Sequence, residues 1–327
     1  MSKAGRRQFL ILSGGLIAAP RLVTAQIVKA AYRIAYLSAG DPGEFSAAFL
    51  QGLRDLGWQD GHNLILDSRW AGGEHQHLAK MARELVRRGP DVIVSITTPA
   101  TRAAVNATQS IPIVFSMVAD PVGSGFIDSL ARPGGNVTGM TFVPELSFFG
   151  KQMELLKELV PDISRVAVIW MPTNPVHSRI VEATKETAKH LGIEAVSSPA
   201  QTLDQLQKIF AALSHHGASA ALVIADLWFY KNQHHLNTLA AKTRVPVMYG
   251  GRNAPESGGL ISYNQDLLDT QRRAAGYVDR ILRGAVPSEL PVGRPTKYEL
   301  VINLKAAREL DITVPQSMML RADALIE

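Results

Sequence analysis

The sequence predicts an α/β fold in which two Rossmann-like lobes each hold a parallel β-sheet covered by helices. Short apolar segments of strand length alternate with longer amphipathic segments of helix length along most of the chain. Strands that alternate with helices form parallel sheets with helices on both faces. The chain has 327 residues, and the alternation restarts twice along it. A chain of that length exceeds the usual size of a single hydrophobic core, so we expect two lobes.

The first group of alternating elements follows a short N-terminal segment. Glu44 begins a predicted helix that ends at Gly57, a residue type favoured just past a helix end. A second helix is predicted around residues 78–85, where apolar residues recur at helical spacing, and a third begins at Pro99. The predicted strands of this group are 33–37, 63–70, 91–96 and 113–116.

The same pattern continues after a break near residue 142 and restarts near Gly258-Gly259. The predicted strands are 137–142, 166–170, 193–197, 220–225, 245–248, 260–263 and 298–302. Helices are predicted around 155–159, 174–191, 203–213, 230–242 and 274–281. Pro287, Pro291 and Pro295 mark a connection before the last strand.

These restarts predict where the chain crosses between lobes. We expect crossings near 142, 258 and 290, which together form a multi-strand hinge. The first lobe then comprises residues 31–142 plus about 259–290, and the second comprises 143–258 plus about 291–327. Residues 1–25 lie outside both lobes.

Residues 1–25 are typical of a cleavable export signal. A basic head is followed by an apolar run at 9–19 and by small residues before Gln26. The apolar run is shorter than the roughly 20 residues that span a bilayer, so a membrane anchor is the weaker interpretation. Arg6-Arg7, followed by Phe9 and Leu10, favours the twin-arginine export route over the general one. We expect a periplasmic protein.

Charge and cysteine content exclude several classes of function. The chain carries a formal charge of +5, but four of its basic residues and no acid lie within 1–25, so the remainder is close to neutral, at +1. A near-neutral protein lacks the basic surface that binds nucleic acid or anionic lipid. With no cysteine, the chain cannot form disulfides, thiolate metal sites or a lipid-modified cysteine.

Candidate ligand-binding residues lie where the predicted strands end, because ligands of open parallel sheets bind outside the carboxyl ends of strands. Hydroxyls and helix amino ends suit a carboxylate, aspartates suit an ammonium group, and aromatic faces suit stacking. The pattern therefore predicts a small polar or zwitterionic ligand. The candidates are Ser38, Thr97, Thr98, Asp120, Asn174, Asp226 and Tyr249.

Several candidates also have a purely structural interpretation. Thr98 before Pro99 and Asn174 before Pro175 are typical helix caps. Asp120-Pro121 is equally typical of a turn. Asp226 follows an apolar strand without an obvious local partner, which favours ligand contact.

Signatures of enzymes and metal sites are weak. The chain has no Gly-x-Ser-x-Gly elbow, no phosphate-binding loop and no Gly-x-Gly-x-x-Gly after a strand. Histidine pairs occur at 75/77, 215/216 and 234/235, and we expect them to be solvated surface residues. The sequence thus predicts no catalytic residues, no metal and no cofactor.

Two stretches resemble a known family: Leu130-Ala131-Arg132-Pro133-Gly134-Gly135-Asn136-Val137-Thr138-Gly139 and Pro295-Thr296-Lys297-Tyr298-Glu299-Leu300-Val301-Ile302-Asn303-Leu304-Lys305. With weaker matches such as Asp120-Pro121-Val122-Gly123, they make the chain similar to the substrate-binding proteins of ABC transporters. These have the type I periplasmic binding fold and include tryptophan and tyrosine receptors. The resemblance runs from about Arg33 to the C-terminus.

The resemblance implies two lobes that close over one small ligand, with an amino acid, preferably aromatic, as a candidate. It also implies a membrane permease with its ATPase as partners, a monomeric receptor and no covalent chemistry. The same seven residues would lie at its pocket positions. Two alternatives stay open: a receptor for a sensory kinase, and a periplasmic hydrolase or lyase with Asp120 or Asp226 as base.

Overall fold

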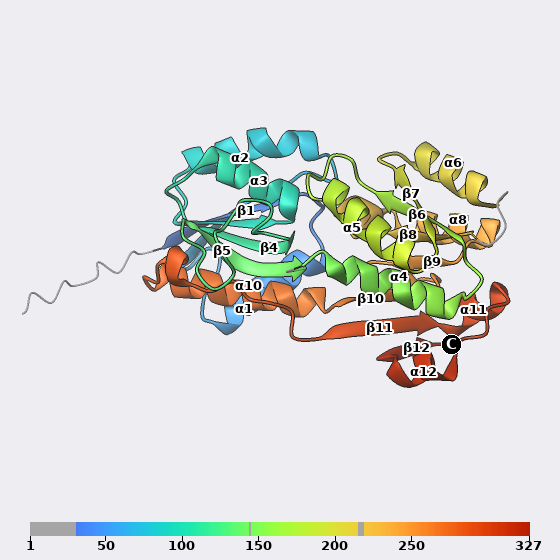
Figure 1. The fold of residues 1–327 in the computed structure, drawn as a ribbon. Coiled ribbons are helices and arrows are strands. Elements are labelled where there is room, and N and C mark those ends of the chain that lie inside the picture. The colour runs from blue at the N-terminus through green and yellow to red at the C-terminus, as the bar shows by residue number, and fades with distance from the viewer. Residues whose placement is uncertain (1–30, 144, 215–218) are drawn as a thin grey trace, which may run out of the picture. The chain divides into compact units, whose positions relative to one another are not determined.

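The computed structural model describes residues 31–143, 145–214 and 219–327, and these residues form two separate β-sheets (Figure 1). The export signal expected at 1–25 lies outside the described residues. We call the first sheet and the helices packed on it the first lobe, and the second sheet with its helices the second lobe.

The first sheet is fully parallel, with strand order β2-β1-β3-β4-β5. Its strands are β1 (Tyr32–Ser38), β2 (Leu64–Trp70), β3 (Val92–Ile96), β4 (Ile113–Ala119) and β5 (Val137–Val143). Its helices are α1 (Glu44–Asp55), the 3-10 turn η1 (His75–His77), α2 (Leu78–Arg87), α3 (Thr98–Ala107) and α10 (Leu267–Leu282).

Alternate side chains of β1 enter different cores of this lobe. Ile34 and Tyr36 pack with α1 and α10 on one face, while Ala35 and Leu37 pack with α2 and α3 on the other. Figure 1 shows these two helix pairs on opposite faces of the sheet. The alternation is the period of two expected of strands, so a sheet buried on both faces explains the nearly continuous apolar strand sequences.

Helix α10 follows a strand of the second sheet along the chain but packs against the first sheet. Gly52 permits its close approach to α1, because a Cβ at that position would lie 2.8 Å from the carbonyl oxygen of Arg272. The glycine is therefore required by packing rather than by a turn.

The second sheet has strand order β12-β11-β10-β9-β8-β6-β7. Its strands are β6 (Arg165–Trp170), β7 (Glu194–Pro199), β8 (Ser219–Val223), β9 (Val247–Tyr249), β10 (Ile261–Gln265), β11 (Tyr298–Asn303) and β12 (Ala324–Ile326). All pairs are parallel except β10 with β11, which is antiparallel. The antiparallel pair is possible because a long connection containing α10 separates β10 from β11, so the chain can return to the sheet from the opposite direction.

Helices cover both faces of the second sheet. They are α4 (Ser147–Leu159), α5 (His177–His190), α6 (Leu203–Ser214), α7 (Leu227–Lys231), α8 (Gln233–Thr243), α9 (Asn253–Glu256), α11 (Leu304–Glu309) and α12 (Gln316–Arg321). A further 3-10 turn, η2 (Pro287–Glu289), lies in the proline-rich connection.

Three features differ from the sequence-based expectations. Strand β10 pairs with β9 and β11, so the chain leaves the second sheet after Gln265, later than the crossing expected near 258. The helix expected at 230–242 is two helices, α7 and α8, separated at Asn232. Helix α5 begins at His177 rather than at Asn174, because residues 171–177 form turns closed by backbone hydrogen bonds from Asn174 to Met171 and from His177 to Asn174.

Candidate functional site

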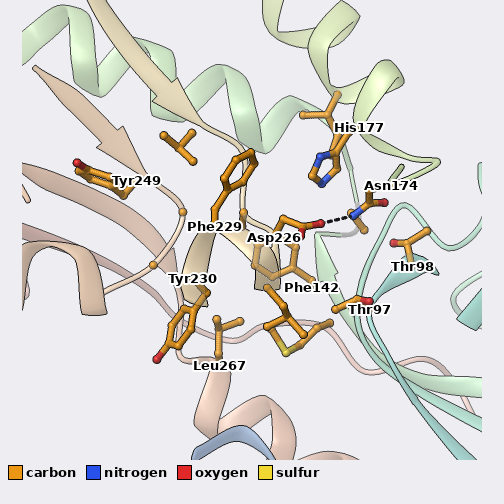
Figure 2. Close-up of a pocket in the computed structure, with 18 of the residues that line it drawn as sticks. Thr97, Thr98, Phe142, Asn174, His177, Asp226, Phe229, Tyr230, Tyr249 and Leu267 are labelled. Carbon is orange, nitrogen blue, oxygen red and sulfur yellow. Dashed lines mark hydrogen bonds between the residues drawn. The ribbon is translucent and has the colours of Figure 1, made fainter. Parts of the chain in front are cut away.

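A cavity lies at the carboxyl ends of strands from both sheets. The segment after β3, the last residues of β4 and β5, and the start of α1 line it from the first lobe, and the segments after β6, β8 and β9 line it from the second. Its empty space, counted together with the open solvent at its mouth, is about 730 Å³. Figure 2 shows Asp226 near its centre, with Asn174 and His177 on one side and Phe229 and Tyr230 on the other.

Asp226 is a buried carboxylate held by uncharged donors. Its side chain is 3% exposed and caps α7: Oδ1 accepts the Trp228 N–H at 2.9 Å, and Oδ2 accepts the Asn174 side-chain amide at 3.0 Å (Figure 2). No lysine or arginine is among the described residues that line the cavity. A buried charge is costly unless a counter-charge meets it, so Asp226 is suited to receive a cation from the cavity.

Asn174 orients this carboxylate instead of capping α5. Its Nδ2 donates to Asp226, and its Oδ1 accepts the Val176 N–H at 3.4 Å. The amide is thus fixed at both ends, which holds the Asp226 side chain in one orientation.

His177 packs behind the carboxylate as a neutral imidazole. Its Nδ1 accepts the Met171 N–H at 3.1 Å. Complete burial lowers the pKa of His177 to about 4, against the opposing attraction of Asp226 and a hydrogen bond to the backbone of Ala225. Since the ring stays uncharged at neutral pH, it leaves the negative charge of Asp226 uncompensated.

Thr97 and Thr98 form a second polar part of the cavity, at the start of α3. Thr97 has a φ of 81°, a left-handed conformation that is rare for a β-branched residue. Its Oγ1 is buried and has no hydrogen-bond partner among the described residues. A free hydroxyl beside the first turn of a helix suits an anionic group, because the first amides of a helix lack partners within the helix.

The remaining wall is mainly apolar, and its larger side chains are Phe45, Met117, Phe142, Phe149, Phe229 and Leu267. Met117 occupies an irregularity in the pairing of β4 with β5 and has a φ of 57°. A bulge of this kind redirects a side chain at the end of a strand, and here it accompanies a Met117 side chain that lines the cavity. The wall favours a ligand with a large apolar portion.

Tyr230 closes one side of the cavity by contacts with α1 of the first lobe. Its ring lies against Phe45, with centroids 5.0 Å apart, and its hydroxyl donates to the Glu44 carboxylate. The site is therefore bordered by a contact that exists only when the two lobes are together.

The structure brings together five of the seven sequence-predicted residues: Thr97, Thr98, Asn174, Asp226 and Tyr249 all line the cavity. Tyr249 does so with its hydroxyl at the end of the ring remote from Asp226 (Figure 2). That hydroxyl is buried without a partner among the described residues, and burial raises the Tyr249 pKa.

Ser38 and Asp120 do not line this cavity. Ser38 is buried and accepts the Gly40 N–H at 3.1 Å, which stabilises the turn after β1. Asp120 accepts the Gly123 N–H at 2.9 Å and forms an ion pair of 2.8 Å with Arg179 on α5 of the second lobe. Both side chains thus already have partners within the protein.

Sequence reasoning missed His177, Phe45 and Tyr230. Nothing local distinguishes them, because their roles depend on contacts with residues far away along the chain. The expectation that the histidine pairs are solvated is wrong for His75, whose side chain is only 5% exposed, although His77 is 54% exposed. The pair at 215/216 lies outside the described residues. Over the ranges that the structure describes, no cluster of three or more potential metal ligands is found.

The described part of the chain contains no helix long and apolar enough to cross a membrane.

A two-sheet α/β fold with a cavity at the strand ends is the architecture of solute-binding proteins. The chain belongs to the ABC transporter substrate-binding protein family, whose family model matches residues 43–326. This membership confirms the predicted family, the type I fold and the function of a binding protein rather than an enzyme.

Individual relatives agree with this assignment. A conserved domain protein from Vibrio cholerae is 30% identical, with a TM-score of 0.83 over 91% of this chain and 100% of that one. An ABC domain from Streptococcus pneumonia, solved in complex with L-Trp, is 25% identical, with a TM-score of 0.82 over 90% of this chain and 100% of that one. A tyrosine-binding protein of Clostridioides difficile is 28% identical over 81% of this chain and 75% of its own length.

Proposed function

We propose that this chain is an extracytoplasmic receptor that binds an amino acid with an aromatic or other large apolar side chain between its two lobes. The observation that carries the proposal is that one apolar cavity contains two polar groups that lack a partner, a carboxylate and a hydroxyl. Asp226 has no counter-charge among the described residues of the wall, and Thr97 has a buried hydroxyl without a partner among them.

A zwitterionic ligand would supply a counter-charge to Asp226 and a hydrogen-bond acceptor to Thr97. Its ammonium group would bind the Asp226 carboxylate in a charge-assisted hydrogen bond. Its carboxylate would accept from the Thr97 hydroxyl and the first amides of α3. A carboxylate without an amine would meet Asp226 as a like charge, so simple acids fit the cavity less well. Uncharged sugars would leave the charge of Asp226 without a counter-charge.

The apolar wall supplies the rest of the preference. Phe142, Phe149 and Phe229 offer aromatic faces and edges, and rings gain more from such contacts than burial alone provides. The name of the Clostridioides difficile relative and the L-Trp complex of the streptococcal one support the same ligand class.

The lobe arrangement and the N-terminal sequence support the wider assignment. We propose lobes of 31–143 with about 266–290, and 145–265 with about 291–327, that close on the ligand and then dock as a monomer on an ABC permease driven by its ATPase. The basic, apolar and small-residue pattern of 1–25 favours export to the periplasm by the twin-arginine route.

A thermal-shift screen of protein refolded from denaturant tests this proposal, because refolding removes any co-purified ligand. The panel contains the twenty amino acids, matching acids without the amine, and sugars. A ligand at one hundred times its Kd adds about 2.7 kcal/mol of stability. We expect a rise in Tm for aromatic or large apolar amino acids, lost in Asp226→Asn and kept in Asp120→Asn. A rise with sugars only, or an equal rise in Asp226→Asn, would overturn the proposal.

A further inference from the structure

His75 lies on the outer side of Asp226, away from the ligand cavity. It belongs to the first lobe, in η1 after β2, yet its ring reaches two groups of the second lobe. Its Nδ1 is hydrogen-bonded with the Thr173 hydroxyl at 2.9 Å, and its Nε2 lies 4.0 Å from Asp226 Oδ1. The ring lines a separate groove together with Thr173, Trp228 and Lys231. Asp226 thus lies between the cavity on one side and an imidazole on the other.

The contact depends on the lobes being together. Thr173 follows β6 and Asp226 follows β8, so both move with the second sheet, while His75 moves with the first. Three other contacts also join the lobes, and more exposed side chains make them: Arg179 with Asp120, Lys231 with Asp41, and Tyr230 with Glu44. Of these four contacts, the one made by His75 reaches the carboxylate to which we assign the ligand.

We propose that His75 is a positioning residue that senses closure at Asp226 and, when protonated, lowers the affinity of the site for a ligand that carries an ammonium group. This rests on the proposed function, in which Asp226 binds that group. A neutral imidazole at 4.0 Å leaves the carboxylate available, whereas an imidazolium competes with the ligand for the same negative charge.

The hydrogen bond between His75 and Thr173 can form whether or not the imidazole is protonated. A hydroxyl can donate to an unprotonated Nδ1 or accept from a protonated one. The ring therefore keeps its place between the lobes in both states, and only its charge alters. Histidine is the residue type suited to such a change, because its charge switches between about pH 5 and 8.

The ionisable groups around the ring favour this assignment. Asp226 faces it from the segment before α7, and neutral His177 faces it from α5. Lys231 of α7 borders the same groove but is paired with Asp41 at 2.8 Å. On its own turn, Glu74 is paired with His77 at 3.5 Å. Among these groups, Asp226 is the buried carboxylate with an oxygen 4.0 Å from the ring, whereas the Glu74 side chain is 61% exposed.

Protonation has opposite consequences for the two states of the receptor. Without ligand, an imidazolium stands in for the ligand's positive charge and stabilises the closed arrangement. With ligand, two cations share one carboxylate. Because ligand enters an open receptor, both effects weaken binding in acid.

The test compares wild type, His75→Gln and the matched control His77→Gln, which alters the exposed histidine of the same turn. The amide introduced by His75→Gln can still hydrogen-bond to Thr173 but cannot acquire a charge. The affinity for L-tryptophan is measured by titration calorimetry at about pH 8 and about pH 5. We expect binding about tenfold weaker at the lower pH in wild type and His77→Gln, and a change of less than about twofold in His75→Gln.

A second measurement needs no ligand and separates this inference from the proposed function. Small-angle scattering of the ligand-free proteins should show wild type and His77→Gln becoming more compact from about pH 8 to about pH 5, and His75→Gln unchanged. If L-tryptophan fails to bind at either pH while this compaction depends on His75, the ligand assignment fails and the closure role of His75 stands. The same acid response in His75→Gln and wild type, in either measurement, would overturn the inference.

Discussion

Asp120 and Asp226 are two aspartates that follow strands, one in each lobe, and their surroundings differ. Asp120 follows β4 of the first sheet, and Asp226 follows β8 of the second. Asp120 is 19% exposed and faces the Arg179 guanidinium at 2.8 Å. Asp226 is 3% exposed, is held by an amide and a backbone N–H, and has a neutral histidine behind it. The comparison teaches that a position at a strand end makes a carboxylate a candidate for ligand binding. Whether the protein already supplies a counter-charge decides if that carboxylate is free to bind a charged ligand.

The largest expected effect comes from replacing the Asp226 carboxylate by an amide. Asp226→Asn removes the charge that we assign to the ligand's ammonium group, and losing one partner of a buried charge pair costs about 2–5 kcal/mol. We expect the affinity for L-tryptophan to fall by about a few hundredfold, which corresponds to about 3–4 kcal/mol, as measured by calorimetry. A loss below about fivefold would place the ammonium group elsewhere.

Low pH should destabilise the folded protein through His177, the buried neutral histidine that packs behind Asp226. Its folded pKa of about 4 lies below the value near 6.5 of an unfolded chain. Between those values the unfolded state binds more protons, so the stability present above about pH 6.5 is lost as pH falls towards 4. Linkage gives about 3 kcal/mol for this group.

Denaturant unfolding of the ligand-free protein across that pH range measures the effect, with His177→Gln for comparison. The variant should show a smaller decline in the free energy of unfolding. An equal decline in both proteins would show that other groups cause the acid sensitivity.

Thr97→Val should weaken binding without destabilising the free protein. The substitution keeps the β-branched shape in the strained backbone and removes the buried hydroxyl that has no partner among the described residues. A hydrogen bond to a charged group contributes about 1.5–3 kcal/mol, so we expect roughly a tenfold loss for L-tryptophan at the lower end.

Tryptamine, which lacks the carboxylate, provides the matched control for that variant. Its affinity should be nearly the same in wild type and Thr97→Val. Equal losses for both ligands would assign Thr97 a structural role only.

The smallest effect should come from Asp120→Asn. Its ion pair with Arg179 joins the two lobes at a partly exposed position, and such pairs contribute about 0–1 kcal/mol. We expect at most about a fivefold change in affinity, by way of closure, and a faster dissociation rate in stopped-flow measurements. A loss as large as that of Asp226→Asn would remove the distinction between the two carboxylates.

Much of the fold could be predicted because it depends on local patterns. Apolar runs bounded by turn residues located most strands within a few residues, as for 33–37 against Tyr32–Ser38. The break at Asn232 and the pairing of β10 were not predictable in this way, because both depend on tertiary contacts.

The site could be predicted only in part, for the same reason. Strand-end position selected Thr97, Asn174 and Asp226 as candidate ligand-binding residues, and all three line the cavity. The partner that engages Asp120 is Arg179, a residue of another lobe that no local pattern connects to it. Likewise His75 and His77 are two residues apart, and only the folded arrangement distinguishes the one that reaches Asp226 from the one in solvent.

The central claim is that the cavity requires a positive charge on its ligand to match Asp226. Calorimetric titration of the refolded protein with L-tryptophan and with N-acetyl-L-tryptophan tests it directly, because acetylation removes that charge and keeps the indole ring and the carboxylate. We predict binding of L-tryptophan and a loss of at least about a hundredfold for the acetylated compound. Equal affinity for both would contradict the assignment of Asp226 as the group that holds the ligand.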